Sequence, residues 1–212
     1  MSESCIGVYG GTFDPVHVGH LRAASEIQKK LQLDEVKMVL SARPPHRHQP
    51  HTSADDRFSL LEMAVSDVEK LTADNCELLR DGPSYMVDTL AYYRQQTPDC
   101  SLLLILGIEA FNGLMSWHKW QDILQLAHVV VTDRAGFSNQ LSDSMRLYVD
   151  RFITNDKSQL RYQTHGKIYS QPVEPVDVSA TQIRQRIKNN ISVAHMLPIS
   201  CWEEIKQRGL YK

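Results

Sequence analysis

Two histidines follow a pair of glycines near the start of the chain, in the string Gly10-Gly11-Thr12-Phe13-Asp14-Pro15-Val16-His17-Val18-Gly19-His20. Glycines directly after a strand let the backbone approach a polyphosphate without a side chain in the way. His17 and His20 lie three residues apart at the start of an expected helix, so both imidazoles project from one face toward an anion. A bound triphosphate would raise their pKa values and make them partly cationic. The string is neither a Walker A loop nor a G-x-G-x-x-G fingerprint, yet it predicts a phosphate site.

A second helix start lies near the other end of the chain, in Val178-Ser179-Ala180-Thr181-Gln182-Ile183-Arg184. Ser179 followed three residues later by Gln182 is a capping box, which marks the beginning of a helix. Capping does not explain Thr181 and Arg184, which lie one turn further on and share a side of the helix. A hydroxyl and a guanidinium at a helix N-terminus suit the outer phosphates of a nucleotide.

Strands and helices alternate along the whole sequence. We expect strands at 5–9, 35–40, 76–79, 101–106, 128–132, 167–170 and 173–178, and helices at 18–31, 53–65, 85–96, 109–115, 120–125, 141–153, 179–188 and 196–208. This order predicts an α/β fold with a doubly wound, mostly parallel sheet. We expect one domain over residues 1–212, with a C-terminal helical part from about residue 179. Ligands of such sheets bind at the carboxyl ends of the strands, where both helix starts should meet.

The bulk composition excludes several classes of protein. Of 212 residues, 42% are hydrophobic and 23% charged, and the net charge of −2 gives no support for binding nucleic acid or an anionic membrane surface. The four cysteines form no C-x-x-C pair, so we expect reduced, mostly buried thiols and neither a disulfide framework nor a zinc site. No run approaches roughly 18 apolar residues, which argues against a membrane span or signal peptide. We therefore expect a cytoplasmic protein, either a monomer or a homo-oligomer.

The two motifs together resemble those of a known enzyme superfamily. Residues 10–20 are similar to the H-x-G-H signature of the nucleotidyltransferases, and residues 178–184 to their S-x-T-x-x-R segment. Four features resemble the bacterial nicotinate-nucleotide adenylyltransferase family in particular. They are the residues of the first motif, Pro44-Pro45-His46, Ser116-Trp117 and the Gly209-Leu210-Tyr211-Lys212 tail. That resemblance covers nearly the whole chain. It implies a Rossmann-like fold and transfer of AMP from ATP to nicotinate mononucleotide, with Mg²⁺ accompanying the ATP.

The resemblance also assigns roles to individual residues. The catalytic residues it implies are His17, His20 and Arg184. Those that would bind ATP are Gly10, Gly11, Thr12, Phe13, Gly107, Glu109, Arg134, Ser179 and Thr181. Those that would bind the acceptor are Ser41, His46, Arg47, Tyr85, Met86, Trp117 and His118, with Trp117 stacked on the pyridine ring. No residue is expected to bind a metal directly, because Mg²⁺ bridging phosphate oxygens needs few protein ligands.

Three positions depart from the family pattern, and several alternatives stay open. The family usually has Asp at Glu109, often Thr at Met86 and commonly Asn at Ser41, so the departures bear on acceptor selectivity more than on the reaction. The alternative acceptors are nicotinamide mononucleotide and phosphopantetheine, and a cytidylyltransferase or a non-catalytic nucleotide sensor is also possible on this fold. The histidines of residues 46–51 could bind a metal, although a basic phosphate lid fits that proline-rich loop better. An NAD-dependent dehydrogenase is disfavoured by the missing glycine fingerprint.

Overall fold

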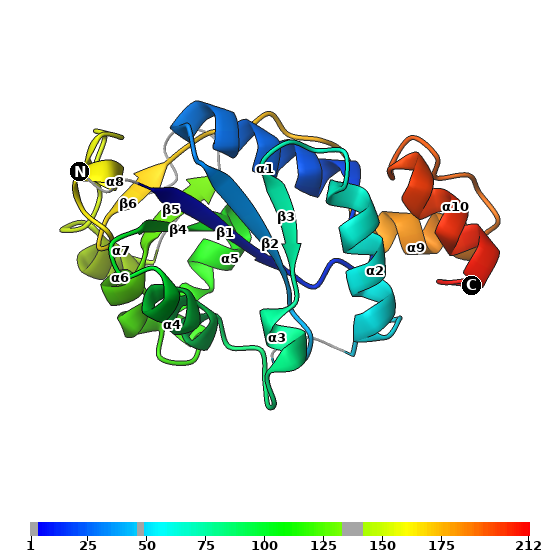
Figure 1. Ribbon diagram of the computed structural model, residues 1–212, viewed down its shortest axis with the longest axis horizontal. Coiled ribbons are helices and arrows are strands. Elements are labelled where there is room, and N and C mark those ends of the chain that lie inside the picture. The colour runs from blue at the N-terminus through cyan, green and yellow to red at the C-terminus, as the bar shows by residue number, and fades with distance from the viewer. Residues whose placement is uncertain (1–3, 46–48, 133–141) are drawn as a thin grey trace.

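A single parallel sheet organises the chain. The computed structural model describes residues 4–45, 49–132 and 142–212. Within them, six strands pair in the order β3-β2-β1-β4-β5-β6, every pair parallel (Figure 1). Their bounds are β1 Cys5–Gly11, β2 Glu35–Leu40, β3 Leu71–Asp74, β4 Ser101–Gly107, β5 His128–Thr132 and β6 Ile168–Ser170. The chain order reverses between β1 and β4, so the predicted doubly wound fold is confirmed.

The central strand β4 is apolar along its length because both of its faces are covered. Leu103 and Ile105 pack into one hydrophobic core, whereas Leu102 and Leu104 pack into a second core on the opposite face. All four side chains are fully buried. Alternate side chains of a strand point to opposite faces, so a strand between two helical layers must be apolar at every position.

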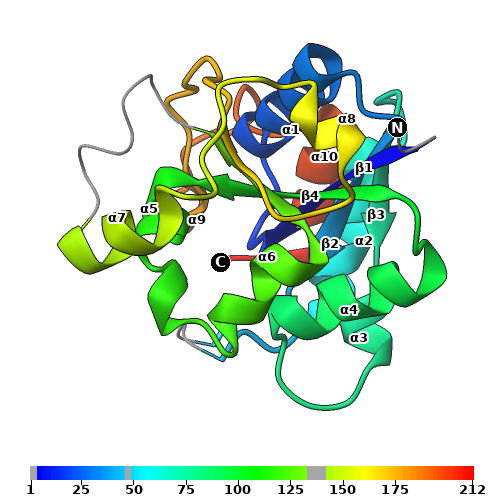
Figure 2. The ribbon, with the colours of Figure 1, turned by 90° about the vertical axis from the view of Figure 1, so that its left-hand side faces the viewer.

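Helices form one layer on each face of the sheet. The first core receives side chains from α1 Val18–Leu31, α2 Ala54–Val65, α8 Gln159–Tyr162, α9 Ala180–Lys188 and α10 Ile199–Arg208. The second receives them from α4 Met86–Gln96, α5 Ile108–Asn112, α6 Ile123–Leu126 and α7 Asp143–Val149, and from the 3₁₀ turns η1 Leu114–Ser116 and η2 Trp120–Asp122 that lie between α5 and α6. Figure 2 shows α1 on one side of β4 and α4 and α6 on the other. In Figure 1, α9 and α10 lie beyond the end toward which β1 points.

Helices α2 and α9 begin directly after serine residues that cap them. Ser53 accepts a hydrogen bond from the Asp56 N–H at 3.0 Å and begins α2. Ser179 accepts one from the Gln182 N–H at 3.2 Å and begins α9. Both satisfy a backbone donor that the first helical turn leaves unpaired. The predicted starts of these two helices are confirmed.

The strand predicted at residues 76–79 is wrong, since this segment is the short helix α3 Cys76–Leu79. The Asp74 carboxylate accepts a hydrogen bond from the Cys76 N–H at 2.8 Å, which turns the chain out of the sheet. The strand that pairs with β2 is β3, which ends at Asp74 just before this turn. An apolar run as short as that of α3 does not distinguish a buried strand from a helical turn.

Other predicted elements also differ in extent, among them the last helix, which begins at Ile199 and not at Met196. Residues 173–178 form no strand. Pro172 lies directly before the segment and Pro175 lies within it, and neither has an N–H to donate to a neighbouring strand. The helix predicted at 141–153 covers only Asp143–Val149. The first strand continues through Gly10 and Gly11, which lie opposite Val39 and Leu40 of β2. The glycines therefore belong to the end of β1 and not to the turn that follows it.

The cysteines carry no cross-link in the structure. All four are free, and Cys5, Cys100 and Cys201 are buried, which confirms the expectation of mostly buried thiols. Burial raises the pKa of the Cys5 and Cys201 thiols to about 11, so both stay protonated near neutral pH. Across the described ranges, no helix combines the length and the apolar character needed to cross a bilayer.

Candidate active site

The two helix starts predicted from opposite ends of the sequence meet at the carboxyl edge of the sheet. Arg184 of α9 donates a hydrogen bond from Nη1 to the backbone oxygen of Asp14 at 2.6 Å. Its Nη2 donates to the Thr181 hydroxyl at 3.2 Å, so these two side chains share one side of α9 as expected. Asp14 lies three residues before His17, the residue that precedes α1. The guanidinium is therefore held against the loop that carries the histidine pair.

The two histidines of that pair lie face to face. Their ring centroids are 3.7 Å apart, and the ring planes differ by 25°. The His17 N–H donates to Nδ1 of His20 at 3.3 Å, which places the proton of a neutral His20 ring on Nε2. His20 can therefore donate from Nε2 to a phosphate oxygen without losing its bond to the helix start.

His17 is buried, and its Nδ1 has no hydrogen-bond partner in the described part of the chain. Burial lowers the pKa of His17 to about 4, so the ring is neutral near pH 7 in the protein alone. The cationic state expected from the sequence would thus arise only when an anion binds. A buried polar atom without a partner costs free energy, and a phosphate oxygen would supply the missing partner.

Two glycines bring neighbouring side chains close to the phosphate loop. A Cβ atom at Gly11 would lie 2.7 Å from the ring of Phe13, and one at Gly10 would clash with the terminal methyl of Met86. Phe13 has a φ of 47° and is buried. Its ring lies edge-on to His20, with centroids 5.1 Å apart. Gly11 therefore makes room for the ring that orients His20.

Asp14 joins the phosphate loop to two other segments. Its Oδ2 accepts a hydrogen bond from the His51 N–H at 2.9 Å and lies 3.1 Å from the His51 Nδ1. Its Oδ1 accepts one from the Thr52 hydroxyl at 3.4 Å, and that hydroxyl lies 3.1 Å from the Tyr211 hydroxyl. The sequence analysis considered only the histidines of residues 46–51, as a phosphate lid or metal ligands, and predicted none of these contacts, which span up to 159 residues of chain.

Arg57 of α2 is 1% exposed and lies beneath the phosphate loop. Its Nη1 donates to the backbone oxygens of Thr12 at 2.7 Å and Ser41 at 2.8 Å, and its Nη2 donates to that of Ala42 at 3.1 Å. Burial lowers the pKa of its guanidinium, while the nearby Asp14 carboxylate acts in the opposite direction. One side chain thus fixes the loop after β1 to the loop after β2. Sequence analysis missed it, since an Arg in an amphipathic helix normally faces solvent.

A cavity of about 320 Å³ adjoins the phosphate loop. Tyr85 and His118 stack along one part of it, with ring centroids 4.2 Å apart. The predicted site residues that line it are Gly10, Gly11, Thr12, Ser41, Tyr85, Met86, Glu109, Trp117 and His118. Gly107 ends β4 directly before α5. His46, Arg47 and Arg134 lie outside the described residues, and the roles of all these residues are still predictions.

Glu77 also lines this cavity and was not predicted from the sequence. It is 3% exposed, its Oε1 accepts a hydrogen bond from the Thr89 hydroxyl at 2.6 Å, and its Oε2 has no partner among the described residues. Burial raises the pKa of this carboxyl group. The sequence analysis missed Glu77 because it assigned residues 76–79 to a strand, and that assignment gave no reason to expect a buried glutamate.

The raised pKa of Glu77 predicts a pH-dependent effect of the Glu77→Gln substitution. In the unfolded chain this carboxyl has a pKa of about 4.3. The stability that protonated Glu77 contributes is therefore fully present below about pH 4 and is lost as the pH rises through its higher folded-state pKa. Glutamine stays neutral, so the free energy of unfolding of the variant should rise relative to that of the parent between pH 4 and pH 8.

Urea unfolding across this pH range measures that difference. Glu62→Gln, a substitution at an exposed position of α2, is the matched control and should show a much smaller change with pH. A difference between Glu77→Gln and the parent that is the same at every pH would contradict the raised pKa.

Comparison with known proteins adds independent findings. Residues 8–186 match the cytidylyltransferase-like family. The chain is 41% identical to a probable nicotinate-nucleotide adenylyltransferase of Halorhodospira halophila, over 97% of this chain and 94% of the relative. It is 43% identical to one of Pseudomonas fluorescens, over 98% and 97%. A solved structure of the Plasmodium falciparum nicotinic acid mononucleotide adenylyltransferase complexed with NaAD superposes with a TM-score of 0.73, covering 98% of this chain and 97% of the other at 15% identity, which supports the fold.

Proposed function

Because this chain belongs to the nicotinate-nucleotide adenylyltransferase family, we propose that it transfers AMP from ATP to nicotinate mononucleotide, releasing pyrophosphate. The product is deamido-NAD, so the reaction is a step of NAD biosynthesis. The observation that carries the proposal is the contact between Arg184 and the Asp14 backbone, which unites the two phosphate-binding helix starts in one site. The four free cysteines support a reducing compartment, the cytoplasm, as its location.

The proposed reaction needs no nucleophile from the protein. An oxygen of the acceptor's 5′-phosphate forms a bond to the α-phosphorus of ATP. The bond from that phosphorus to the oxygen bridging to the β-phosphate breaks, and its electron pair leaves with pyrophosphate. The protein contributes position and charge neutralisation. In this scheme His20 donates from Nε2 to the transferring phosphate, and Arg184 and Thr181 hold the phosphates that leave.

The acceptor would occupy the cavity beside the phosphate loop. Trp117 offers an aromatic face for the pyridine ring, and the free N–H groups at the start of α4 suit its carboxylate. Met86, at the first position of α4, also reaches over Gly10 at the end of β1. Position 86, where the family often has threonine, therefore contacts both the phosphate loop and the acceptor cavity.

Magnesium fits this site as a companion of ATP. The Asp14 carboxylate is buried and already accepts hydrogen bonds from His51 and Thr52, so it is not free to hold a cation. The phosphate oxygens of ATP are therefore the natural ligands of Mg²⁺, which would neutralise part of their charge.

An acceptor panel tests the proposal. The protein is supplied with ATP and nicotinate mononucleotide, nicotinamide mononucleotide or phosphopantetheine, and pyrophosphate release is measured. We expect kcat/KM to be highest for nicotinate mononucleotide, and CTP in place of ATP to support little turnover. A preference for either other acceptor would refute the assigned substrate. ATP binding without pyrophosphate release for any acceptor would refute the enzymatic function.

A further inference from the structure

A second cavity, of about 660 Å³, opens beside Arg184 on the side of the chain's tail. Three segments line it, namely the loop that leads into α2, one side of α9, and the tail that follows α10. Thr181 and Arg184 belong to its wall, but none of the residues around the acceptor cavity does. It is therefore a separate space that begins at the residues proposed to hold the outer phosphates.

The charges in this wall favour a polyanion. Arg184, Lys188 and Lys212 contribute cations. The carboxylate in the wall, Asp56, is bound by the guanidinium of Arg208, so its charge is neutralised. The hydroxyl groups of Ser53 and Thr181, which accept hydrogen bonds within the protein, add neutral hydrogen-bond donors.

Helix α9 places two of these cations on one face. Lys188 follows Arg184 by four residues, which puts the side chains one above the other. The helix contains no acidic residue that could separate them. Like charges at this spacing repel each other and destabilise a helix. An anion bound between the two side chains would attract both cations and so offset their mutual repulsion.

The tail holds Lys212 at the same cavity. Gly209, with a φ of 64°, ends α10 and turns the chain back. The Lys212 Nζ lies 3.7 Å from the point where a Cβ of Gly209 would be, so its side chain folds over that glycine. The preceding residue, Tyr211, contacts the Thr52 hydroxyl, which in turn binds Asp14. The position of Lys212 is thus linked to the phosphate loop.

We propose that this cavity binds pyrophosphate as it departs, with Lys188 and Lys212 as ligands beyond Arg184. The proposal rests on the proposed function for the identity of the anion. Pyrophosphate released at Thr181 and Arg184 would enter the cavity directly, without passing the space occupied by the dinucleotide product. Charge repulsion between the two products would be lowered by three cations of the protein.

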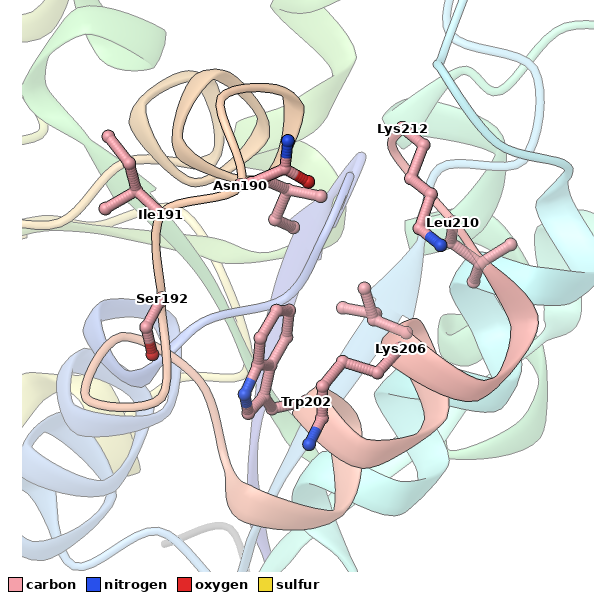
Figure 3. A pocket seen from close by; sticks show the side chains of 9 residues that line it. Asn190, Ile191, Ser192, Trp202, Lys206, Leu210 and Lys212 are labelled. Atoms are coloured by element: carbon pink, nitrogen blue, oxygen red, sulfur yellow. The ribbon is translucent and has the colours of Figure 1, made fainter.

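A neighbouring cavity supplies a matched control (Figure 3). Its volume is about 280 Å³, and Ile187, Trp202 and Leu210 make it mostly apolar. Figure 3 shows Lys206 beside Trp202, well apart from Lys212. The Lys206 Nζ lies 5.4 Å from the Trp202 ring and 2.8 Å from the Glu203 carboxylate. Lys206 is an exposed lysine of the same region that lines only this apolar cavity, whereas Lys212 lines both cavities.

The experiment compares Lys188→Gln, Lys212→Gln, the double variant and Lys206→Gln. Calorimetry measures the Kd of inorganic pyrophosphate for each free protein. Assays in both directions give the KM for pyrophosphate with deamido-NAD and the KM for ATP with nicotinate mononucleotide. Each exposed ion pair contributes about 0.2–1 kcal/mol, so the double variant, which loses two, should bind pyrophosphate roughly 2- to 30-fold more weakly. We expect the KM for ATP to change less than about 2-fold, and Lys206→Gln to behave as the parent.

Three results would overturn the proposal. One is an unchanged Kd for pyrophosphate in the double variant. Another is a rise in the KM for ATP as large as that for pyrophosphate, which would place both lysines on the bound substrate. The third is an equal loss in Lys206→Gln, which would indicate a general effect of surface charge. The calorimetric arm needs no reaction, so it tests the cavity even if every acceptor in the panel fails.

Discussion

Replacing His20 by alanine is expected to lower kcat by about 100- to 1,000-fold, the cost of losing one donor aimed at developing charge. The hydrogen bond from the His17 N–H to Nδ1 places the proton of a neutral His20 ring on Nε2, from which it can donate to phosphate. The effect should fall on kcat more than on the KM for ATP, since the interaction strengthens as the α-phosphorus changes its bonding. Steady-state assays with ATP and nicotinate mononucleotide measure both constants.

Two further variants identify the cause of such a loss. His20→Asn keeps a side-chain oxygen that can accept the His17 N–H, so a comparable loss in kcat would exclude weakened capping of α1 as the reason. His165→Ala removes a histidine at the amino end of the sheet, just before β6, and should leave kcat close to that of the parent. Unchanged turnover in His20→Ala would remove this residue from the mechanism.

Arg57→Met is expected to lower the free energy of unfolding by about 3–5 kcal/mol. Methionine keeps most of the apolar stem but leaves the backbone oxygens of Thr12, Ser41 and Ala42 without their donors. Because these oxygens belong to the loops after β1 and β2, the folded fraction should also lose kcat. Urea unfolding measures the first effect. Assays at a temperature where the variant is folded measure the second.

Arg94 offers a control of the same chemical kind at the other end of the sheet. Its guanidinium donates to the backbone oxygens of Cys100, Leu126 and Thr164, which precede β4, β5 and β6. Arg94→Met should therefore destabilise the protein while the folded fraction keeps its kcat. Equal losses of kcat in both variants would show that Arg57 acts only through global stability.

The sequence predicted the elements whose pattern is local. Strand β4 was evident because it is apolar from Leu102 to Leu106, and α1 because its apolar residues repeat at helical spacing. The start of α9 followed from Ser179 and Gln182. Helix α3 was missed because four residues are too few to show a period, and the Asp74 carboxylate that starts it acts through a contact to the backbone.

The residues of the candidate site likewise fall into those that the sequence could predict and those that it could not. Residues of the two motifs could be chosen from the sequence because each motif is contiguous and lies at a helix start. Asp14, Arg57, Glu77 and Tyr211 acquire their importance from partners 12 to 159 residues away. Neither residue type nor spacing reveals such partners. Which charged side chains are buried can be read only from the folded structure.

The two glycines at the end of β1 resist substitution for different reasons, and this has an evolutionary consequence. Neither has the left-handed backbone that demands glycine, so within the protein itself the obstacle to a larger residue is a neighbouring side chain. At Gly10 the obstacle is the flexible end of Met86. A lineage with a shorter residue at position 86 would therefore have room for alanine at position 10. At Gly11 the obstacle is the Phe13 ring, which also orients His20. As far as packing within the protein is concerned, a substitution at position 10 must therefore follow one at position 86, whereas a substitution at position 11 would displace the ring that orients His20.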